Sequence, residues 1–426
     1  MLPLVRIVST GSEITQGLYA DTNAQRLSRL LLERGFKVIG HAAAPDDPAL
    51  IRKAIADAMP GIDLIVMTGG LGPTEDDVNR DVIAELLGLE LVRDARAEEM
   101  LRKRFATRNI PMPERNVVQA MLPAGCVPLY NHWGTAPGFF IAAGGTHPAL
   151  LALPGPSSEW KPMIEAALQD ELAGQFPGRP IRATHTMHVA MIAESVVNQA
   201  LRDLFTWDRR VELGLLAHRG NIRIRLIATE STAEAARALI NQLRALILER
   251  IPAELIHTEG PETATPAAAA LDMLRRQGRR LAIAESCTGG GIAQAITDVP
   301  GCSDVFAAGW VTYCNEAKTR DLGVPAALID THGAVSEEVA LAMACGARQR
   351  AGADVALSVT GIAGPAGGTP EKPVGTVWFG CASAERAIAR RYQFSGDRDA
   401  IREWSVNQGL ELLRRFIAGV DPARGL

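Results

Sequence analysis

Aromatic residues, paired cysteines and long apolar runs are all scarce in this sequence. Phe, Trp and Tyr together make up only 5% of the 426 residues, too few for the stacking platforms that hold single-stranded nucleic acids. The six cysteines include no CxxC spacing, which argues against a disulfide framework or a zinc site and indicates reduced thiols. No apolar run approaches the roughly 18 residues that a membrane-spanning helix needs.

A strong excess of one charge is also missing, because the net charge is only −4. This balance argues against a dedicated nucleic-acid binder, so we expect no nucleic-acid partner. The apolar run at the N-terminus is too short for a signal peptide, and we expect a cytoplasmic protein with no membrane partner. Hydrophobic residues at 47% and charged residues at 22% are typical of soluble globular proteins. The length predicts about three domains.

Residues 1–175 alternate between short apolar stretches and amphipathic stretches, as expected for strands alternating with helices. This alternation predicts a mostly parallel sheet with helices on both faces. In such sheets, ligands bind beyond the C-terminal ends of the strands. The expected strands are 4–8, 37–39 and 64–67, and the expected helices are 23–33 and 48–58.

The most unusual loop of this part is TGGLGPTEDD, which directly follows the strand at 64–67. Its glycines allow the backbone to approach a ligand closely, and their N–H groups can hold phosphate. Asp76 and Asp77 offer hard oxygen ligands for a divalent cation beside that phosphate. The alternative, which we weight more for either residue alone, is that they cap a helix continuing through residues 82–87.

The motifs STGSEITQG, TGGLGPTEDD, NHWGTAPGF and LPGPSSEW resemble the N-terminal domain of the CinA family. That domain is similar in fold to molybdopterin-binding domains. The resemblance implies metal-dependent hydrolysis of the pyrophosphate bond of ADP-ribose. His132 and Trp133 stand where relatives commonly have proline and a small apolar residue. The implied substrate-binding residues are Glu13, Asn23, Gly69, Gly70, Gly72, Thr74, Asn131, Gly134, Thr135, Gly138 and Gly155, and Asp76 and Asp77 would line the same pocket as metal ligands. Asp47, which follows an expected strand, could supply a further metal ligand or a base.

Residues 176–256 read as a small α+β module, with alternating strands at 182–192 and 221–228 and helices at 194–204 and 233–248. In the family that it resembles, this module is KH-like. A GxxG loop is absent at residues 192–195, so we expect a spacer or dimerising piece and no RNA binding. The polar segment at residues 257–266 is expected to be a linker.

The stretch LAIAESCTGGG, which spans residues 281–291, opens the last domain, 267–426. Strand, hydroxyl-rich turn, glycines and helix form an arrangement that points backbone N–H groups at an anion. It also places the hydroxyl of Ser286 beside those donors, as suits a nucleophile next to an oxyanion or phosphate pocket. The alternative, with equal weight from this stretch alone, is a capped turn without chemistry.

A serine nucleophile needs a base, and no histidine is well placed in the sequence. Lys318 follows an apolar strand at 305–312, so burial could lower its pKa and make it the base; taken alone, it reads more readily as a solvated surface lysine. Tyr313 or Thr360 could relay the proton or donate to an oxyanion. Cys287 is a rival nucleophile but has no histidine nearby in the sequence.

The motifs AESCTGG, TDVPG, VTYCNEAK, GAVSEEVA, SVTGIAGPAGG and FSGDRDAIR resemble the nicotinamide-nucleotide amidase domain, PncC. This resemblance implies deamidation of nicotinamide mononucleotide to nicotinate mononucleotide and ammonia, without a metal. Ser286 would be the nucleophile and Lys318 the base, with Tyr313 and Thr360 assisting. The implied substrate-binding residues are Gly289, Gly290, Gly361, Gly364, Gly367 and Arg398.

We therefore expect two three-layer α/β domains with mostly parallel sheets, joined by a small α+β, KH-like module. The expected ligands are small-molecule nucleotides, and the family resemblance implies a homodimer. Two alternatives stay open. The first is that only one of the two domains is active, and the second is that the chain is a non-enzymatic adaptor in competence or DNA damage.

Overall fold

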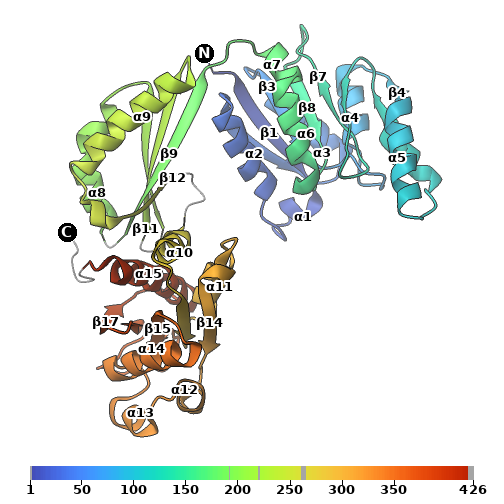
Figure 1. Ribbon diagram of the computed structural model, residues 1–426. Helices are drawn as coiled ribbons and strands as arrows, with labels where there is room; N and C mark the ends of the chain where they lie inside the picture. The colour runs from blue at the N-terminus through green and yellow to red at the C-terminus, as the bar shows by residue number, and fades with distance from the viewer. Residues whose placement is uncertain (1, 191, 219–220, 261–264, 421–426) are drawn as a thin grey trace. The chain divides into compact units, whose positions relative to one another are not determined.

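The computed structural model describes residues 2–190, 192–218, 221–260 and 265–420 (Figure 1). The chain divides into two compact units. The first unit consists of Met1–Ala183 with Thr229–Arg237, and the second of Thr184–Ala228 with Ala238–Leu426. None of the helices in the described ranges is both long and apolar enough to cross a bilayer.

The first unit is built on a six-stranded sheet with the strand order β2-β1-β3-β8-β7-β6. The first four of these strands run parallel, whereas β7 and β6 are added in antiparallel orientation. The strands are β1 Leu4–Thr10, β2 Lys37–Ala44, β3 Leu64–Thr68, β6 Val127–Leu129, β7 Gly138–Ile141 and β8 Ala149–Leu153.

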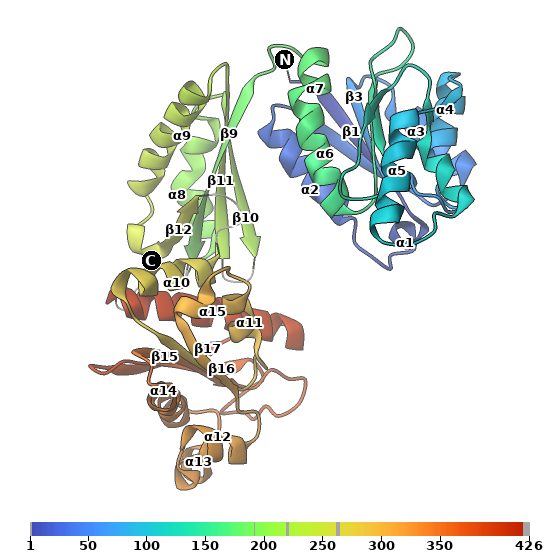
Figure 2. The same ribbon diagram turned by 45° about the vertical axis from the view of Figure 1, so that its right-hand side comes forward.

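Helices cover both faces of this sheet (Figure 2). Helices α2 (Thr22–Glu33) and α6 (Ser157–Gln169) pack on one face, and α3 (Pro48–Ala58) and α4 (Asn79–Leu87) pack on the other. The three layers follow from strands that are apolar on both sides, since every residue of β3 and β8 is buried. The remaining elements of this unit are α1 Ser12–Thr15, β4 Leu91–Arg93, α5 Ala95–Thr107, η1 Glu114–Ala120, β5 Met121–Pro123 and α7 Glu171–Gln175.

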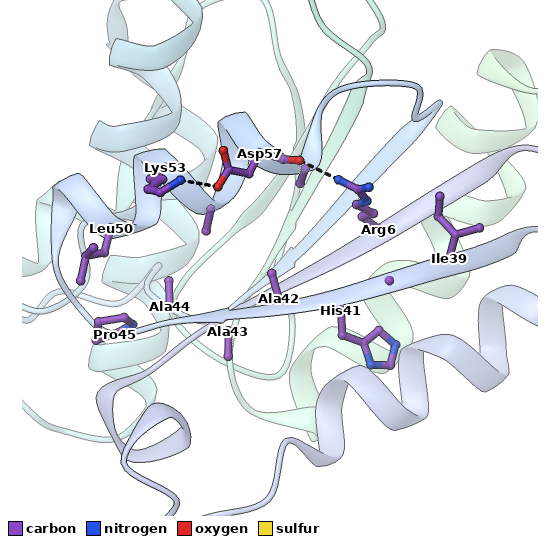
Figure 3. Close-up of a pocket in the computed structure, with 13 residues that line it drawn as sticks. Arg6, Ile39, His41, Ala42, Ala43, Ala44, Pro45, Leu50, Lys53 and Asp57 are labelled. Atoms are coloured by element: carbon purple, nitrogen blue, oxygen red, sulfur yellow. Dashed lines mark hydrogen bonds and ion pairs between the residues drawn. The ribbon is translucent and has the colours of Figure 1, made fainter.

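An open groove of about 500 Å³ lies between the edge strand β2 and α3 (Figure 3). Lys53 points toward the carboxylate of Asp57, at 2.7 Å, and Arg6 donates to the main-chain carbonyl of Asp57 at 2.6 Å. Ile39 and Leu50 contribute apolar lining. Its charged groups therefore already have partners within the groove, and none of the sequence motifs contributes a nucleophile to it.

The KH-like module contains a four-stranded sheet with the order β10-β11-β9-β12. Strand β12 (Ile256–Gly260) pairs antiparallel with β9, so the start of the expected linker at 257–266 is part of a sheet. That expectation is corrected: His257 is the only buried residue of this strand, so its polar sequence lacks the apolar alternation that indicates a strand. Residues 261–264 lie outside the described ranges. The module's other elements are β9 Ile181–Ala190, α8 Glu194–Leu201, η2 Arg202–Thr206, β10 Val211–His218, β11 Asn221–Glu230, α9 Ala233–Leu248 and η3 Ala253–Leu255.

The C-terminal domain has a five-stranded sheet with the order β14-β13-β15-β16-β17. Strands β14, β13 and β15 are parallel, and β16 and β17 are antiparallel additions. The strands are β13 Leu281–Glu285, β14 Phe306–Val311, β15 Val355–Gly361, β16 Thr376–Ala382 and β17 Ala387–Gln393.

Two groups of helices sandwich this sheet, with α10, α11 and α15 on one face and α12, α13 and α14 on the other (Figure 1). The expected class of three-layer α/β domains with mostly parallel sheets is thus confirmed. The helices are α10 Pro266–Gln277, α11 Gly291–Thr297, α12 Asn315–Leu322, α13 Ala326–His332, α14 Glu337–Ala351 and α15 Arg398–Ala418, with a short 3-10 turn at Cys302–Asp304.

Candidate active site

Ser286 and Lys318 meet at the C-terminal ends of two neighbouring parallel strands. Ser286 is the first residue after β13, and Lys318 lies in α12, which follows β14. The amide of Thr312 donates to the carbonyl of Glu285 at 2.8 Å, which ties the two strand ends together. The Nζ atom of Lys318 lies 3.2 Å from the Oγ atom of Ser286. The two residues expected to act together are therefore in direct contact.

The surroundings of Lys318 favour an uncharged amine. Its side chain is only 1% exposed, and burial lowers its pKa below the ordinary value of 10.5. Besides Ser286, its Nζ atom contacts the carbonyl oxygens of Thr312 at 2.8 Å and Tyr313 at 3.4 Å. A neutral amine has two N–H bonds and one lone pair. In the structure Nζ donates to the Ser286 Oγ atom; an amine that has lost this proton faces the Ser286 hydroxyl with its lone pair.

A buried carboxylate, which sequence reasoning did not assign, fills the N-terminus of α11. Glu285 is 1% exposed and is placed where the helix dipole favours a negative charge. Its carboxylate accepts hydrogen bonds from Thr288 Oγ1 at 2.6 Å, Gly290 N at 3.0 Å, Ile292 N at 3.1 Å and Ala293 N at 2.8 Å. Glu285 therefore fixes the turn on which Ser286 stands.

This carboxylate changes the expected role of the glycine turn. The amide of Gly290 donates to Glu285, and the amide of Gly289 donates to the carbonyl of Ser286 at 3.0 Å. Both N–H groups are thus occupied by partners within the chain. The expectation that the N–H groups of Gly289 and Gly290 hold phosphate is corrected: their N–H groups shape the turn.

Tyr313, Gly364 and Arg398 come together as the sequence predicted, but in another arrangement. Arg398 donates to the phenolic oxygen of Tyr313 at 2.8 Å and to the carbonyl of Gly364 at 2.8 Å. The Tyr313 side chain is 59% exposed, and only its main-chain carbonyl contacts Lys318. Arg402, one helical turn further along α15, was not predicted and donates to the carbonyl of Thr288 at 3.0 Å.

Thr360 and Cys287 are buried near the same strand ends. The hydroxyl of Thr360 donates to the carbonyl of Ala334 at 2.8 Å, so its described hydrogen bond holds a loop and does not reach Ser286. Burial raises the pKa of the Cys287 thiol to about 12, which leaves it a poor nucleophile. A side chain on Gly361 would come within 3.1 Å of that sulfur. Gly367, in the following loop, has a φ of +92° that favours glycine.

In the first unit, polar groups gather at the ends of β1, β3 and β8. Asn23 donates to the carbonyl of Gly155 at 2.7 Å and to the hydroxyl of Thr68 at 3.2 Å. Asn79, which sequence reasoning missed, donates to the carbonyl of Gly69 at 2.7 Å. A side chain on Gly70 would meet that of Asn79 within 2.6 Å. The structure thus brings Asn23, Gly69 and Gly155 together, as predicted.

The loop after β6 is organised by Asn131. Its Oδ1 atom accepts from the amides of Trp133 at 2.9 Å and Gly134 at 2.6 Å, and its Nδ2 atom donates to Glu159 at 2.6 Å. A side chain on Gly134 would overlap the Glu159 carboxylate. Of the other predicted residues, Thr135 is half-buried in this loop and Gly138 begins β7, where a side chain would meet the carbonyl of Ala152 at 2.5 Å.

The residues expected to bind metal do not form a metal site of their own. Asp47 caps α3 by accepting from the amide of Leu50 at 3.0 Å, and Asp77 accepts from the amide and hydroxyl of Thr74 at 2.8 and 2.5 Å. Within the described ranges, no group of three or more His, Cys, Asp or Glu side chains could hold a metal ion. The assignment of Asp47, Asp76 and Asp77 as metal ligands stays a prediction.

The alternative for Asp76 and Asp77 is wrong, because α4 begins at Asn79 after Val78, with no side-chain cap. Glu13 and Gly72, two further residues that were predicted to bind substrate, take part in close local packing. A side chain on Gly72 would come within 2.5 Å of the Asp77 carboxylate, and one on Gly11 would come within 2.5 Å of the Glu13 carboxylate. Tight packing against carboxylates accounts for these glycines.

Three families match successive parts of the chain. Residues 6–174 match the family described as "Probable molybdopterin binding domain". Residues 184–256 match "Damage-inducible protein CinA KH domain", and residues 263–417 match "CinA C-terminal domain".

Similar proteins extend over almost the whole chain. It is 42% identical over 426 residues to a competence-damage inducible protein of Symbiobacterium thermophilum, covering 98% of this chain and 99% of that protein. It is 40% identical over 424 residues to a CinA-like protein of Citrifermentans bemidjiense, covering 99% and 100%. Among solved structures, the competence/damage inducible protein CihA from Agrobacterium tumefaciens is 41% identical, with 35% of this chain and 91% of that chain covered and a TM-score of 0.34.

Proposed function

Because the chain belongs to the CinA family, we propose that it is a hydrolase of pyridine-nucleotide recycling. Its C-terminal domain removes the carboxamide nitrogen of nicotinamide mononucleotide and releases nicotinate mononucleotide and ammonia. The observation that carries this proposal is the contact of 3.2 Å between the buried Lys318 amine and the Ser286 hydroxyl. An adaptor protein has no need for a buried lysine facing a serine at the ends of two strands.

The proposed reaction begins when neutral Lys318 takes the proton of the Ser286 hydroxyl. The Oγ atom then forms a bond to the carboxamide carbon, and the C=O electron pair moves to the oxygen. When the carbonyl reforms, the C–N bond breaks and the protonated Lys318 gives its proton to the leaving NH2 nitrogen, which departs as ammonia. An ester between Ser286 and the nicotinate group is left. Water attacks this ester, with Lys318 again as base, and releases the acid and the free serine.

Two features of this chain support such a reaction. Burial disfavours the charged form of Lys318 and lowers its pKa below the ordinary value, which favours its proposed role as a base. Glu285 locks the turn of Ser286 through its contacts to the start of α11, which keeps the nucleophile in a fixed orientation. Arg398 and Arg402 add positive charge beside the turn and are our candidates for the nucleotide's phosphate.

The proposal is tested by incubating the purified protein with nicotinamide mononucleotide and measuring ammonia release. Release by the wild-type protein that is lost in Ser286→Ala supports the amidase. A chelator should leave the rate unchanged, because no step is assigned to a metal. No release by the folded wild-type protein would contradict it.

As a second function, we propose that the N-terminal domain hydrolyses the pyrophosphate bond of ADP-ribose. The gathering of Asn23, Gly69 and Gly155 at neighbouring strand ends favours a nucleotide pocket there. The need for a divalent metal stays a prediction, which a chelator tests in an ADP-ribose hydrolysis assay. The cytoplasmic location and the homodimer also stay predictions, and gel filtration with light scattering tests the latter.

A further inference from the structure

The loop between β3 and α4, residues 69–78, rests on a buried arginine at the start of α4. Arg80 is only 1% exposed. Its guanidinium donates to two successive main-chain carbonyls of the loop, to that of Leu71 through Nη1 and to that of Gly72 through Nη2 at 3.2 Å. Because the guanidinium is a rigid, planar fork, this one side chain fixes the orientation of two neighbouring peptide groups.

The hydrogen bonds of Arg80 serve this loop and not an ion pair. Among the residues that the structure describes, no carboxylate lies within ion-pair distance of its guanidinium. Burial lowers the pKa of Arg80 against the opposing effects of Asp81 and Asp77, but an arginine in a protein keeps its charge. This buried charge therefore depends on the two carbonyl oxygens, which ties the position of the arginine to the shape of the loop.

The preceding residue, Asn79, holds the start of the same loop. Its side chain is fully buried and donates to the carbonyl of Gly69 at 2.7 Å. Its amide donates to the carbonyl of Gly70 at 3.1 Å. Asn79 and Arg80 thus bind the carbonyls of four consecutive residues, 69–72, from the side on which α4 begins.

The binding of these carbonyls decides where the N–H groups of the loop point. In a planar trans peptide, the C=O of one residue and the N–H of the next point in opposite directions. The N–H groups of Gly70, Leu71 and Gly72 therefore point away from the start of α4. Within the described part of the chain, these three N–H groups have no hydrogen-bond partner. The N–H of Gly72 is oriented by the contact between Arg80 and the carbonyl of Leu71.

We propose that Arg80 is a positioning residue of the N-terminal domain, which turns the N–H of Gly72 toward the diphosphate of the substrate. This proposal rests on the second function proposed above, the hydrolysis of ADP-ribose. Arg80 acts on the substrate only through the main chain of the loop. Lysine is a single point charge on a flexible stem, so Arg80→Lys keeps the charge but loses the hold on two carbonyls.

The first test is the steady-state hydrolysis of ADP-ribose by the full chain, with folding checked by thermal melting. Arg80→Lys and Arg80→Met should each raise KM at least fivefold with a smaller fall in kcat, because the N–H of Gly72 is no longer held toward the substrate. Partial unfolding would instead lower kcat and leave KM unchanged, since the folded fraction keeps its site. The matched control is Arg115→Met, because the exposed Arg115 pairs with the exposed Glu75 of the same loop, and its KM should stay within twofold of wild type.

The second test separates this role from the hydrolysis itself. Calorimetric titration with inorganic pyrophosphate measures anion binding without any bond being broken. The affinity should be at least fivefold weaker in Arg80→Lys than in wild type and unchanged in Arg115→Met. If wild type shows this binding but does not hydrolyse ADP-ribose, the second function fails and the positioning role stands. A folded wild type that does not bind pyrophosphate, or a wild-type KM or pyrophosphate affinity in Arg80→Lys, would overturn the proposal.

Discussion

Lys318 Nζ lies 3.2 Å from Ser286 Oγ, and the carbonyls of Thr312 and Tyr313 hold the amine in that position. Lysine is almost never fully buried without a carboxylate partner. Here its Nζ contacts are a hydroxyl and two main-chain oxygens, which stabilise an amine without requiring that it be charged. This arrangement is compatible with the proposed role of a buried Lys318 as base.

The first prediction concerns stability and pH. The pKa of Lys318 is lowered in the folded state by burial, so the unfolded state binds more protons at pH values between the folded pKa and the ordinary value of 10.5. The folded state is therefore penalised at low pH, and the penalty is lost as the pH rises. Lys318→Met should raise the free energy of unfolding relative to wild type most at pH 6, and progressively less toward pH 10.

Urea unfolding at several pH values measures this difference. Arg320→Met, an exposed cation on the same helix, is the matched control and should show no such trend. A difference between Lys318→Met and wild type that does not vary with pH would show that folding does not lower the pKa of Lys318.

The second prediction concerns Glu285. Glu285→Gln removes the charge from the start of α11 and places an amide donor among groups that are themselves donors. We expect a loss of about 2–3 kcal/mol in stability and a fall in kcat of about 10- to 100-fold with a smaller change in KM. Steady-state kinetics and urea unfolding measure both effects. Glu316→Gln, an exposed carboxylate on α12, is the control.

An effect of Glu285→Gln on stability with kcat at the wild-type level would contradict a positioning role. It would show that the buried carboxylate supports the fold but that the orientation of Ser286 does not depend on it.

The third prediction separates the two parts of Tyr313. Its carbonyl contacts Lys318, whereas its phenol is bound to Arg398 and exposed. Tyr313→Phe keeps the carbonyl, so kcat should fall by less than about fivefold, well below the 100-fold or more expected on removal of a proton-transfer group. Ammonia release kinetics measure this. A fall of more than 100-fold would restore the phenol as a proton relay.

The fourth prediction excludes the rival nucleophile. The Cys287 thiol is 4% exposed with a pKa of about 12, so it carries almost no thiolate at pH 8. Cys287→Ser should retain activity within about threefold, and iodoacetamide at pH 8 should label the exposed Cys314 first. Mass spectrometry of the labelled protein gives the order. Early labelling of Cys287 with loss of activity would make it the better candidate.

The sequence predicted the meeting of Ser286 and Lys318 because strand order follows from general rules. Residues after parallel strands share one edge of the sheet, and both side chains follow such strands. This rule works because it needs only the ends of elements and not the direction of any side chain. Asn23, Gly69 and Gly155 were predicted instead from the resemblance to the CinA family, and the structure brings them together.

The sequence did not predict the directions in which the side chains of the site point. A glycine turn after a strand is equally suited to an external phosphate and to an internal carboxylate, and here Glu285 fills it. The available signal in the sequence was the acidic residue Glu285 at the end of an apolar strand, shortly before the glycines and the start of a helix. The phenol of Tyr313 and the hydroxyl of Thr360 point to partners on α15 and on the loop at Ala334, which no local pattern specifies.

The local partners of the aspartates in the first unit could not be predicted for a related reason. Asp47 and Asp77 accept hydrogen bonds from nearby amides and a hydroxyl, and their role as metal ligands stays a prediction. In the C-terminal domain, the edge strand β17 runs antiparallel to β16 because only residues 383–386 connect them, whereas a parallel neighbour needs a long crossover.

The most direct test of the central claim is ammonia release from nicotinamide mononucleotide by wild type, Ser286→Ala and Ser303→Ala, at equal concentration and with folding checked by thermal melting. The account predicts release by wild type and Ser303→Ala, and a rate at least about 10³-fold lower for Ser286→Ala. Equal rates for Ser286→Ala and wild type would contradict it.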